Sequence, residues 1–254
     1  CLYSFILLVA AVYGSHYFVF SVEVYIFCEA NSSYLTNKNN TMKVKKLSGK
    51  VQDAQQIPTL FDNENITYHP IDIVNWKEYP YQPQVSFRIA YTNDAILVHY
   101  KVVEDSVRAK YGEDNGSVWT DSCVEFFSIP AGDGIYYNLE CNCIATILLA
   151  AGSERSNREM APLEITDQVK RWASLGRETF EEKIGECTWE VALQIPYKVF
   201  FKHTITKLDG MVVRANFYKC GDELQKPHFL SWSPIKIEKP DFHRPDFFGL
   251  LEFE

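Results

Sequence analysis

Residues 85–102 read VSFRIAYTNDAILVHYKV, and this stretch decides the fold class of the chain. Bulky apolar residues fall at every second position on either side of Thr92-Asn93-Asp94. Alternation with a period of two is typical of a strand that buries one face, and a short polar segment between two such runs is typical of a turn. The stretch therefore predicts a β-hairpin.

Strand patterns continue on the C-terminal side of this hairpin. Residues 119–129, 136–149 and 212–220 alternate between apolar and polar side chains. Residues 179–195 are predicted to form a second hairpin that turns around Gly185. Several short strands separated by turn residues are typical of antiparallel β proteins.

The best candidate for a helix is the segment 164–175. Ile165, Val169 and Trp172 recur there at helical spacing. Strands do not alternate with long helices anywhere in the chain, which argues against a parallel α/β fold. The sequence therefore predicts an all-β fold, an antiparallel β-sandwich with one or two short helices.

The composition limits the classes of partner. The chain has 254 residues, a formal net charge of −8 and no basic run beyond residues 43–46. Phosphate backbones are bound by clustered cations, so nucleic acid is not an expected partner. The length suits one large β domain plus an N-terminal appendage.

The N-terminal residues 1–22 contain no Asp, Glu, Lys or Arg, and such a run is long enough to span a bilayer. It could be a membrane anchor, a leader peptide, or sequence upstream of a start at Met42, with residues 31–41 as a polar linker. We therefore expect residues 1–41 to lie outside the folded domain, which spans residues 42–254. The protein is exported or anchored if the run is used, and cytoplasmic if Met42 is the start.

The seven cysteines do not form a recognisable metal motif. Cys141 and Cys143 point to one face of a strand, but no second CxC or CxxC accompanies them, so zinc is not predicted. Most of the cysteines are interpreted as small buried apolar residues, which fits a reducing compartment.

Catalytic signatures are largely absent, since the chain has no nucleophile elbow, zinc-protease motif or phosphate-binding loop. Glu125, Glu140 and Glu190 lie in strand-like runs, and two of them could act as a glycosidic acid and base. The simpler interpretation is that they are polar strand residues facing solvent or a ligand.

Metal ligands are a further possibility near the C-terminus, where Asp and His residues gather in a Pro-rich loop. Such residues also hydrogen-bond their own backbone in loops, and we favour that interpretation. The four residues are His228, Asp241, His243 and Asp246.

Aromatic residues offer a stronger signal for binding. Trp232 lies in a Pro-rich loop and Trp119 opens a strand, while Arg214, Asn216 and Tyr218 share one face of the strand 212–220. Sugars are bound by flat aromatic faces and planar polar groups together. We therefore expect a carbohydrate site rather than a catalytic one.

Four motifs in order resemble the family 9 carbohydrate-binding modules, most closely the stand-alone family 9-like proteins of gut Bacteroidetes. They are WTDSCVEFF at residues 119–127, NFYKC at 216–220, FLSWSP at 229–234 and HRPDFFG at 243–249. The resemblance covers roughly residues 83–254. It implies a β-sandwich related to the DOMON-like group and a non-catalytic function.

The resemblance also implies a binding site. Trp119 and Trp232 would hold a terminal sugar or oligosaccharide end between them, Glu125 would accept hydrogen bonds from its hydroxyls, and Asn216 would add polar contacts. The family's arginine contact has no match here, and Asn138 or Glu140 occupies about that place. Family members often hold structural calcium, and a glycoside hydrolase is an expected partner.

Two alternatives remain open at the level of sequence. One is a glycan-processing hydrolase that uses two of the three glutamates. The other is a haem or redox domain, since the DOMON group includes haem carriers, with Met160, Met211 or a histidine as axial ligand.

Overall fold

The computed structural model describes residues 2–13, 16–27 and 41–254. The chain divides into two compact units, residues 1–39 and residues 40–254.

The first unit contains two antiparallel strands, β1 (Leu2–Tyr13) and β2 (His16–Phe27). The predicted polar linker 31–41 lies outside the described residues, except for Thr41. Among the described residues, no helix is both long and apolar enough to cross a membrane.

The predicted hairpin is present in the second unit. Strand β6 (Gln84–Tyr91) pairs antiparallel with β7 (Ala95–Ala109), and Tyr91 lies opposite Ile96. The Thr92 hydroxyl donates to the Asp94 carboxylate inside the turn, at 2.8 Å. The alternation at residues 85–102 therefore predicted both strands and their connection correctly.

A single hydrogen-bonded sheet of fourteen strands includes this hairpin. Its strands follow one another in the order β11 (Glu159–Met160), β10 (Ile147–Gly152), β9 (Tyr136–Asn142), β8 (Cys123–Ile129), β14 (Val212–Cys220), β16 (Gly249–Phe253), β3 (Thr41–Lys46), β6, β7, β13 (Phe180–Pro196) and β12 (Lys170–Ala173). Three short strands pair off this path, β4 (His69–Pro70), β5 (Ile73–Val74) and β15 (Phe229–Ser231).

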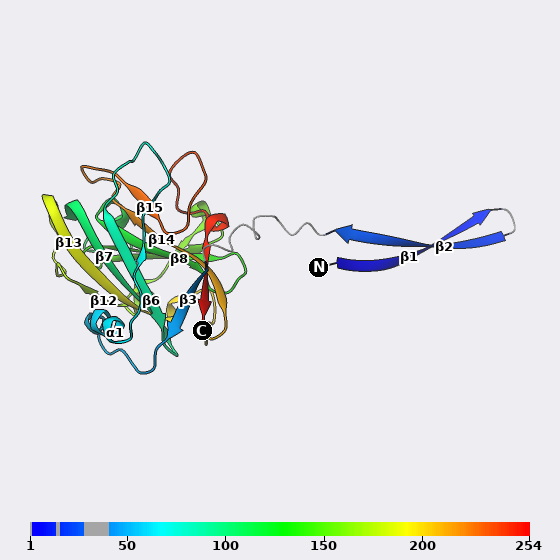
Figure 1. Cartoon of the computed structure of the whole chain (residues 1–254), viewed down its shortest axis with the longest axis horizontal. Coiled ribbons are helices and arrows are strands. Elements are labelled where there is room, and N and C mark those ends of the chain that lie inside the picture. The colour runs from blue at the N-terminus through cyan, green and yellow to red at the C-terminus, as the bar shows by residue number, and fades with distance from the viewer. Residues whose placement is uncertain (1, 14–15, 28–40) are drawn as a thin grey trace. The chain divides into compact units, whose positions relative to one another are not determined.

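Strand β3 joins two halves of the curled sheet (Figure 1). It runs parallel to β16 on one side and to β6 on the other, whereas the other described pairings in the sheet are antiparallel. We call the strands from β11 to β16 the β8 half and those from β6 to β12 the β7 half. The all-β prediction is confirmed, and the parallel pairings make the sheet mixed.

The main hydrophobic core lies between the two halves. Phe87 of β6 stacks on Phe217 of β14 with ring centroids 3.7 Å apart. The Tyr100 hydroxyl of β7 donates to the backbone carbonyl of Glu125 on β8, at 3.0 Å. Side chains of period two on facing strands therefore meet across this layer.

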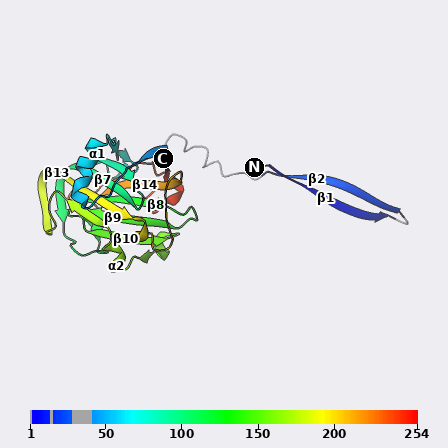
Figure 2. The same ribbon diagram turned by 90° about the horizontal axis from the view of Figure 1, so that it is seen from below.

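Each half also carries a second packed layer on its outer face (Figure 2). Helix α1 (Ile57–Asn63) packs Ile57 and Phe61 against Leu97 of β7. On the β8 half, Phe242 and Phe248 from the Pro-rich C-terminal segment pack against the outward side chains of β8 and β14. In β7, β8 and β14, side chains on both faces of the strand can therefore be buried.

The helix predicted at residues 164–175 is wrong beyond its first turn. Helix α2 spans Leu163–Thr166, and the following residues form β12, where Trp172 lies opposite Ala192 of β13. Isolated short helices are marginal in water. Pairing with β13 gives this segment hydrogen bonds that a short helix could not match.

The second predicted hairpin is also wrong, because residues 180–196 form one long strand. It pairs with β7 along its length, with register shifts between Phe180 and Lys183 and between Ile184 and Cys187. Gly185 has a φ of +126°, a value that suits a bulge as well as a turn. The glycine therefore marks an irregularity in β13 and not the end of a strand.

Two strand predictions need smaller corrections. Trp119 precedes β8 in a 3-10 turn, η4 (Val118–Thr120), so the strand begins at Cys123. The run 136–149 is two strands, β9 and β10, and Ala145 has a φ of +59° in the turn between them.

Candidate functional site

The polar residues predicted on β8, β9 and β14 do share one face of the sheet. Glu125 lies directly opposite Glu140 on β9 and Tyr218 on β14. Directly opposed residues of antiparallel strands point to the same face. Asn138 and Asn216 lie on that face too, because both are opposite Phe127.

This face opens into a hollow beside Trp119. Strand β8, strand β9, the end of β14 and the loops that follow β10 and β15 contribute its walls. The residues that line it are Trp119, Glu125, Glu140, Arg155, Arg158, Cys220, Asp222, Phe229, Pro240, Asp241, Phe242 and His243.

Aromatic rings form one side of the hollow. Trp119 is half-buried, so part of its indole remains open to a ligand. Phe242 is fixed from behind by Tyr218, whose ring is stacked at 4.1 Å and whose hydroxyl donates to the Phe242 carbonyl at 3.1 Å. Tyr218 therefore supports the wall and does not line the hollow.

Two buried carboxylates form the floor. The side chains of Glu125 and Glu140 lie in residues that are each 3% exposed. Burial, followed by the neighbouring Glu140, raises the pKa of Glu125 well above its usual value. Burial also raises the pKa of Glu140 to about 7, against the lowering effects of Asn138 and Arg158.

The hydrogen bonds of these carboxylates are incomplete. Asn138 Nδ2 donates to Glu140 Oε1 at 3.0 Å, and the Cys220 thiol donates to Glu125 Oε1 at 3.1 Å. Glu140 Oε2 is buried and has no hydrogen-bond partner among the residues that the structure describes. A buried acceptor without a donor is costly, so this oxygen is ready to accept from a ligand hydroxyl.

Two arginines reach the hollow from the loop after β10. Arg158 Nη1 lies 3.9 Å from Glu140 Oε1, and Arg155 Nη1 lies 3.9 Å from Asp241 Oδ1. The sequence predicted Arg214 for the site and missed these two arginines, because they lie in a polar loop far from the quoted motifs. The only sequence signal was a charged segment directly after an apolar strand.

Burial also shifts the pKa values of Asp222 and His243 in the hollow. Burial raises the pKa of Asp222 to about 6. Burial, with Arg158 and Arg155, lowers the pKa of His243 to about 3, so this imidazole is neutral at ordinary pH. Its Nδ1 lies 2.9 Å from the Tyr136 hydroxyl.

Trp232 does not line the hollow, so the structure does not assemble the predicted Trp119 and Trp232 pair there. Its backbone N–H donates to the Phe217 carbonyl at 2.9 Å, which continues the pairing of β15 with β14. The indole then packs edge-on against Phe87 and Phe217 in the main core. The ring is partly buried, as that of Trp119 is, so its contacts with the main core and not its degree of exposure keep it out of the hollow.

Asn216 and Arg214 do not line the hollow either. Asn216 accepts from the Ser233 N–H at 2.8 Å and donates to the Ser233 carbonyl at 3.0 Å. Arg214 donates to the Pro245 carbonyl. The predicted polar stripe therefore fastens the C-terminal segment onto the sheet, because that segment covers the face that the sequence left open.

The four residues near the C-terminus that were considered as possible metal ligands are used separately. Buried His228 contacts Lys219, and Asp246 pairs with Arg244. Asp241 accepts from the His243 N–H at 3.0 Å, as expected for a loop that bonds its own backbone, and both residues line the hollow.

Glu190 and the methionines lie outside the hollow. Glu190 Oε2 on β13 is 3.0 Å from His99 Nε2, and Glu190 belongs to the β7 half. It therefore does not form a carboxylate pair with Glu125 or Glu140. Met160 is exposed on β11, and Met211 packs against the main core.

One group of potential metal ligands exists among residues 41–254, and it contains Cys123, Glu125 and Cys220. Calcium takes oxygen ligands, so a set with two thiols does not fit it. Structural calcium elsewhere stays a prediction.

Comparisons with known proteins identify the family. Residues 55–253 match carbohydrate-binding family 9. No curated protein matches the chain. A candidate carbohydrate-binding protein from Bacteroides uniformis is 52% identical, with a TM-score of 0.83, and the match covers 85% of this chain and 99% of that one.

Two more distant structures share the fold. Both are family 9 modules from Caldicellulosiruptor kristjanssonii, one in complex with glucose (12% identity, TM-score 0.53, 84% of this chain and 95% of that one) and one with cellotriose (11%, 0.55, 84% and 93%). The family match spans the hollow and nearly all of the sheet around it. The chain therefore belongs to carbohydrate-binding family 9.

Proposed function

We propose that the hollow holds the end of a mono- or oligosaccharide without reacting with it. The observation that carries this proposal is the open face of Trp119 beside buried carboxylates and two arginines. A pyranose ring has an apolar C–H side that packs on an aromatic ring, and hydroxyls that need strong planar hydrogen-bond partners. The hollow offers both kinds of contact within one small space.

Each lining residue has a role in this proposal. Trp119 packs against the sugar ring, and Phe242 closes the apolar side. Glu140 Oε2, which lacks a partner among the described residues, accepts from one hydroxyl. Arg158 donates to another. Charge-assisted hydrogen bonds of this kind are stronger than neutral ones.

The proposed site keeps one tryptophan of the predicted pair. Trp232 is left out because its ring packs in the main core. Glu125 stays in the site, and Asn138 acts indirectly by orienting Glu140. Asn216, Tyr218 and Arg214 hold the walls in place.

Family membership supports a non-catalytic protein. Directly opposed carboxylates such as Glu125 and Glu140 also occur in glycosidases, but the family is defined by carbohydrate binding. Glucose and cellotriose, which the two distant structures hold, are the first ligands to test. We propose a glycoside hydrolase acting on the same sugar as partner, since a binding module holds substrate near an enzyme.

Calorimetric titration of the full chain with glucose, cellotriose and a panel of other saccharides tests the proposal. We expect saturable binding by the native protein and a loss of at least about 100-fold in Trp119→Ala, as for other aromatic hot spots. The variant should remain folded with a modestly lower melting temperature, because the Trp119 ring is only partly buried against the second hydrophobic cluster.

Trp232→Ala is the matched control. It should lower the melting temperature through the cavity it leaves, while the folded fraction keeps native sugar affinity. Loss of binding in Trp232→Ala with binding retained in Trp119→Ala would contradict the proposed hollow. A folded protein that binds no saccharide of the panel would contradict the function itself.

A further inference from the structure

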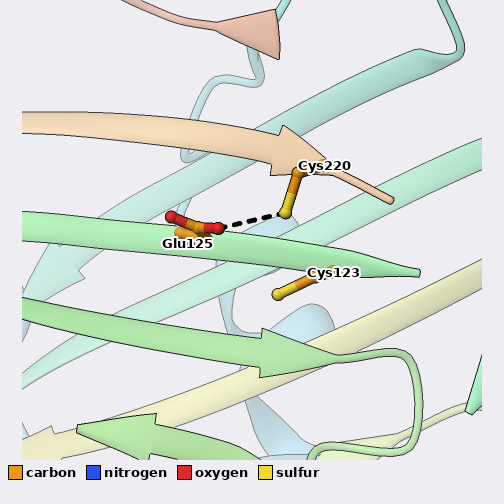
Figure 3. A group of neighbouring side chains, drawn as sticks. All are labelled: Cys123, Glu125 and Cys220. Carbon is orange, nitrogen blue, oxygen red and sulfur yellow. Dashed lines mark hydrogen bonds between the residues drawn. The ribbon is translucent and has the colours of Figure 1, made fainter. Parts of the chain in front are cut away.

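Two cysteines face each other across neighbouring strands beneath the hollow, and Cys220 also lines it. Cys123 on β8 lies directly opposite Cys220 on β14. Their sulfur atoms and a carboxylate oxygen of Glu125 all lie within 4.8 Å of one another. Figure 3 shows the three side chains converging from the two strands, with the thiol of Cys220 bonded to Glu125.

We propose that Cys123, Glu125 and Cys220 form a binding site for a thiophilic divalent cation, with zinc as the first candidate. Two thiolates and a carboxylate form a ligand set that zinc accepts in tetrahedral sites. The inference goes beyond sugar binding and does not depend on it.

The observed spacing is close to what zinc requires. Zinc–sulfur bonds of about 2.3 Å and zinc–oxygen bonds of about 2.0 Å place the two ligand atoms about 3.5 Å apart in a tetrahedron. Cys220 Sγ and Glu125 Oε1 are 3.1 Å apart. A shift of a few tenths of an ångström would therefore admit the ion, which side-chain rotation can supply.

The charge of the site also points to a cation. Glu125 is 3% exposed, and among the residues that the structure describes no Lys, Arg or His lies within ion-pair distance of it. An ionised carboxylate buried there needs a compensating cation, and without one it keeps its proton. Zinc would provide that charge, and the Glu125 carboxyl and the Cys123 and Cys220 thiols would each give one proton to the solvent.

An independent observation indicates where further ligands would come from. Glu125 and Cys220 line the hollow together with Asp222 and Glu140, and the buried Glu140 Oε2 has no hydrogen-bond partner. The fourth coordination position therefore faces the hollow, where a water molecule or Asp222 can occupy it. Catalytic zinc sites leave one position open to solvent in the same way.

The pair that sequence spacing singled out is not involved. Cys141 and Cys143 are buried in the main core between the two halves of the sheet. The proposed ligands come from strands that are adjacent in space and distant in sequence. A search of the sequence for closely spaced cysteines therefore does not find them.

Zinc titration of the full chain tests the site. The reduced protein, freed of metal with a chelator, is titrated with Zn²⁺ against a chromophoric chelator and separately with Co²⁺. We expect one ion per chain and, with cobalt, the near-ultraviolet charge-transfer absorption of thiolate ligands. No sugar is present, so the result is independent of the proposed function.

Variants assign the ligands. Cys123→Ser and Cys220→Ser should each weaken zinc binding by about 100-fold and remove the thiolate absorption, and Glu125→Gln should weaken it less. Cys187→Ser is the control, because Cys187 is a partly exposed thiol on β13, and it should bind zinc like the native chain.

Three results would overturn the proposal. Folded, reduced protein that takes up no zinc would do so, as would native zinc affinity in the Cys123→Ser/Cys220→Ser double variant. The third is a Cys123–Cys220 disulfide that persists in reductant and leaves no thiol to bind metal, detected by mass spectrometry of alkylated peptides.

Discussion

Two neighbouring residues on β14, Lys219 and Cys220, contact two buried carboxylates that differ in how their charge is compensated. Lys219 points toward the core, where its Nζ lies 2.9 Å from Glu104 Oε2 and 2.7 Å from His228 Nε2. Cys220 points to the other face and reaches Glu125, which has no cation within ion-pair distance in the described part of the chain. The charge of Glu104 is compensated by a lysine of the same fold. Glu125 has no such partner in the described part of the chain and is available to a bound ligand or ion.

The surroundings of Glu104 differ from those of Glu125 and Glu140 in where their polar partners come from. Around Glu104 every partner comes from the fold, including Trp189 Nε1, which donates to Oε1 at 2.6 Å. Burial, followed by Lys219, lowers the pKa of His228 well below its usual value, so its neutral ring accepts from Lys219. Among the described residues, Glu104 Oε2 and Glu140 Oε2 both lack a hydrogen bond, but Lys219 Nζ lies 2.9 Å from the former. Arg158 Nη1 is 3.9 Å from Glu140 Oε1, and a hollow opens beside Glu140 and Glu125. Incomplete compensation next to a hollow is what a binding site requires.

Removing the compensating lysine should have the largest effect. Lys219→Met leaves Glu104 charged, buried and unpaired, so we expect the free energy of unfolding to fall by about 3–5 kcal/mol. Denaturant unfolding monitored by tryptophan fluorescence measures this change.

Two further variants test the reason for that loss of stability. The double variant Lys219→Met/Glu104→Gln should recover most of the lost stability, because no buried charge remains. Lys226→Met removes an exposed lysine that pairs with Asp105, and it should cost less than about 1 kcal/mol. Equal losses in Lys219→Met and Lys226→Met would contradict the contrast between the two regions.

The incomplete pairing of Glu140 should appear in the pH dependence of the free energy of unfolding. The pKa of Glu140 is raised from 4.5 to about 7, so the folded state holds a proton that the unfolded state has lost between those values. The contribution of Glu140 to stability is therefore greatest below about pH 4.5 and falls by roughly 2–3 kcal/mol as the pH rises to about 7.

Unfolding of Glu140→Gln provides the comparison, in a buffer that contains a chelator. The amide does not titrate, so this part of the slope between pH 4.5 and 7 should disappear. A native protein whose stability rises through this window, with an unchanged slope in Glu140→Gln, would show that another group controls it.

The smallest expected effect concerns the arginines. Arg158→Gln removes a charged hydrogen-bond donor that lies near Glu140, and it should weaken sugar binding about tenfold, or about 1.5 kcal/mol. Arg155→Gln should have a smaller effect, because its side chain is 63% exposed. Titration calorimetry with the sugar that the native protein binds measures both, and the reverse order would reassign the contact.

Much of the fold could be read from local patterns. The alternation at residues 85–102 gave a hairpin, and the alternation at residues 212–220 gave β14 and the correct division of its faces. The errors occurred where a local signal was ambiguous. Gly185 was taken as a turn but lies in a bulge, and Trp172 suited a helix but lies on a strand.

The site was predictable only in part. Trp119, Glu125 and Glu140 do line the hollow. The first two were identified by their place in the family motifs, and Glu140 by strand alternation and its position near the family's arginine contact. Arg155 and Arg158 were missed, since a loop has no period that tells where its side chains go. The roles of all five residues in sugar binding stay predictions until the titrations are made.

The sequence by itself determined which residues lie on the same face of each strand, because the side-chain period of two is a local property of the backbone. It also carried the ordered motifs that mark family 9. Only the tertiary structure decided which face is covered, which loop brings its arginines to Glu140, and that Cys123 meets Cys220. These depend on how strands distant in sequence pair and how the C-terminal segment closes over them, and hydrogen bonding and burial across the whole sheet settle that arrangement.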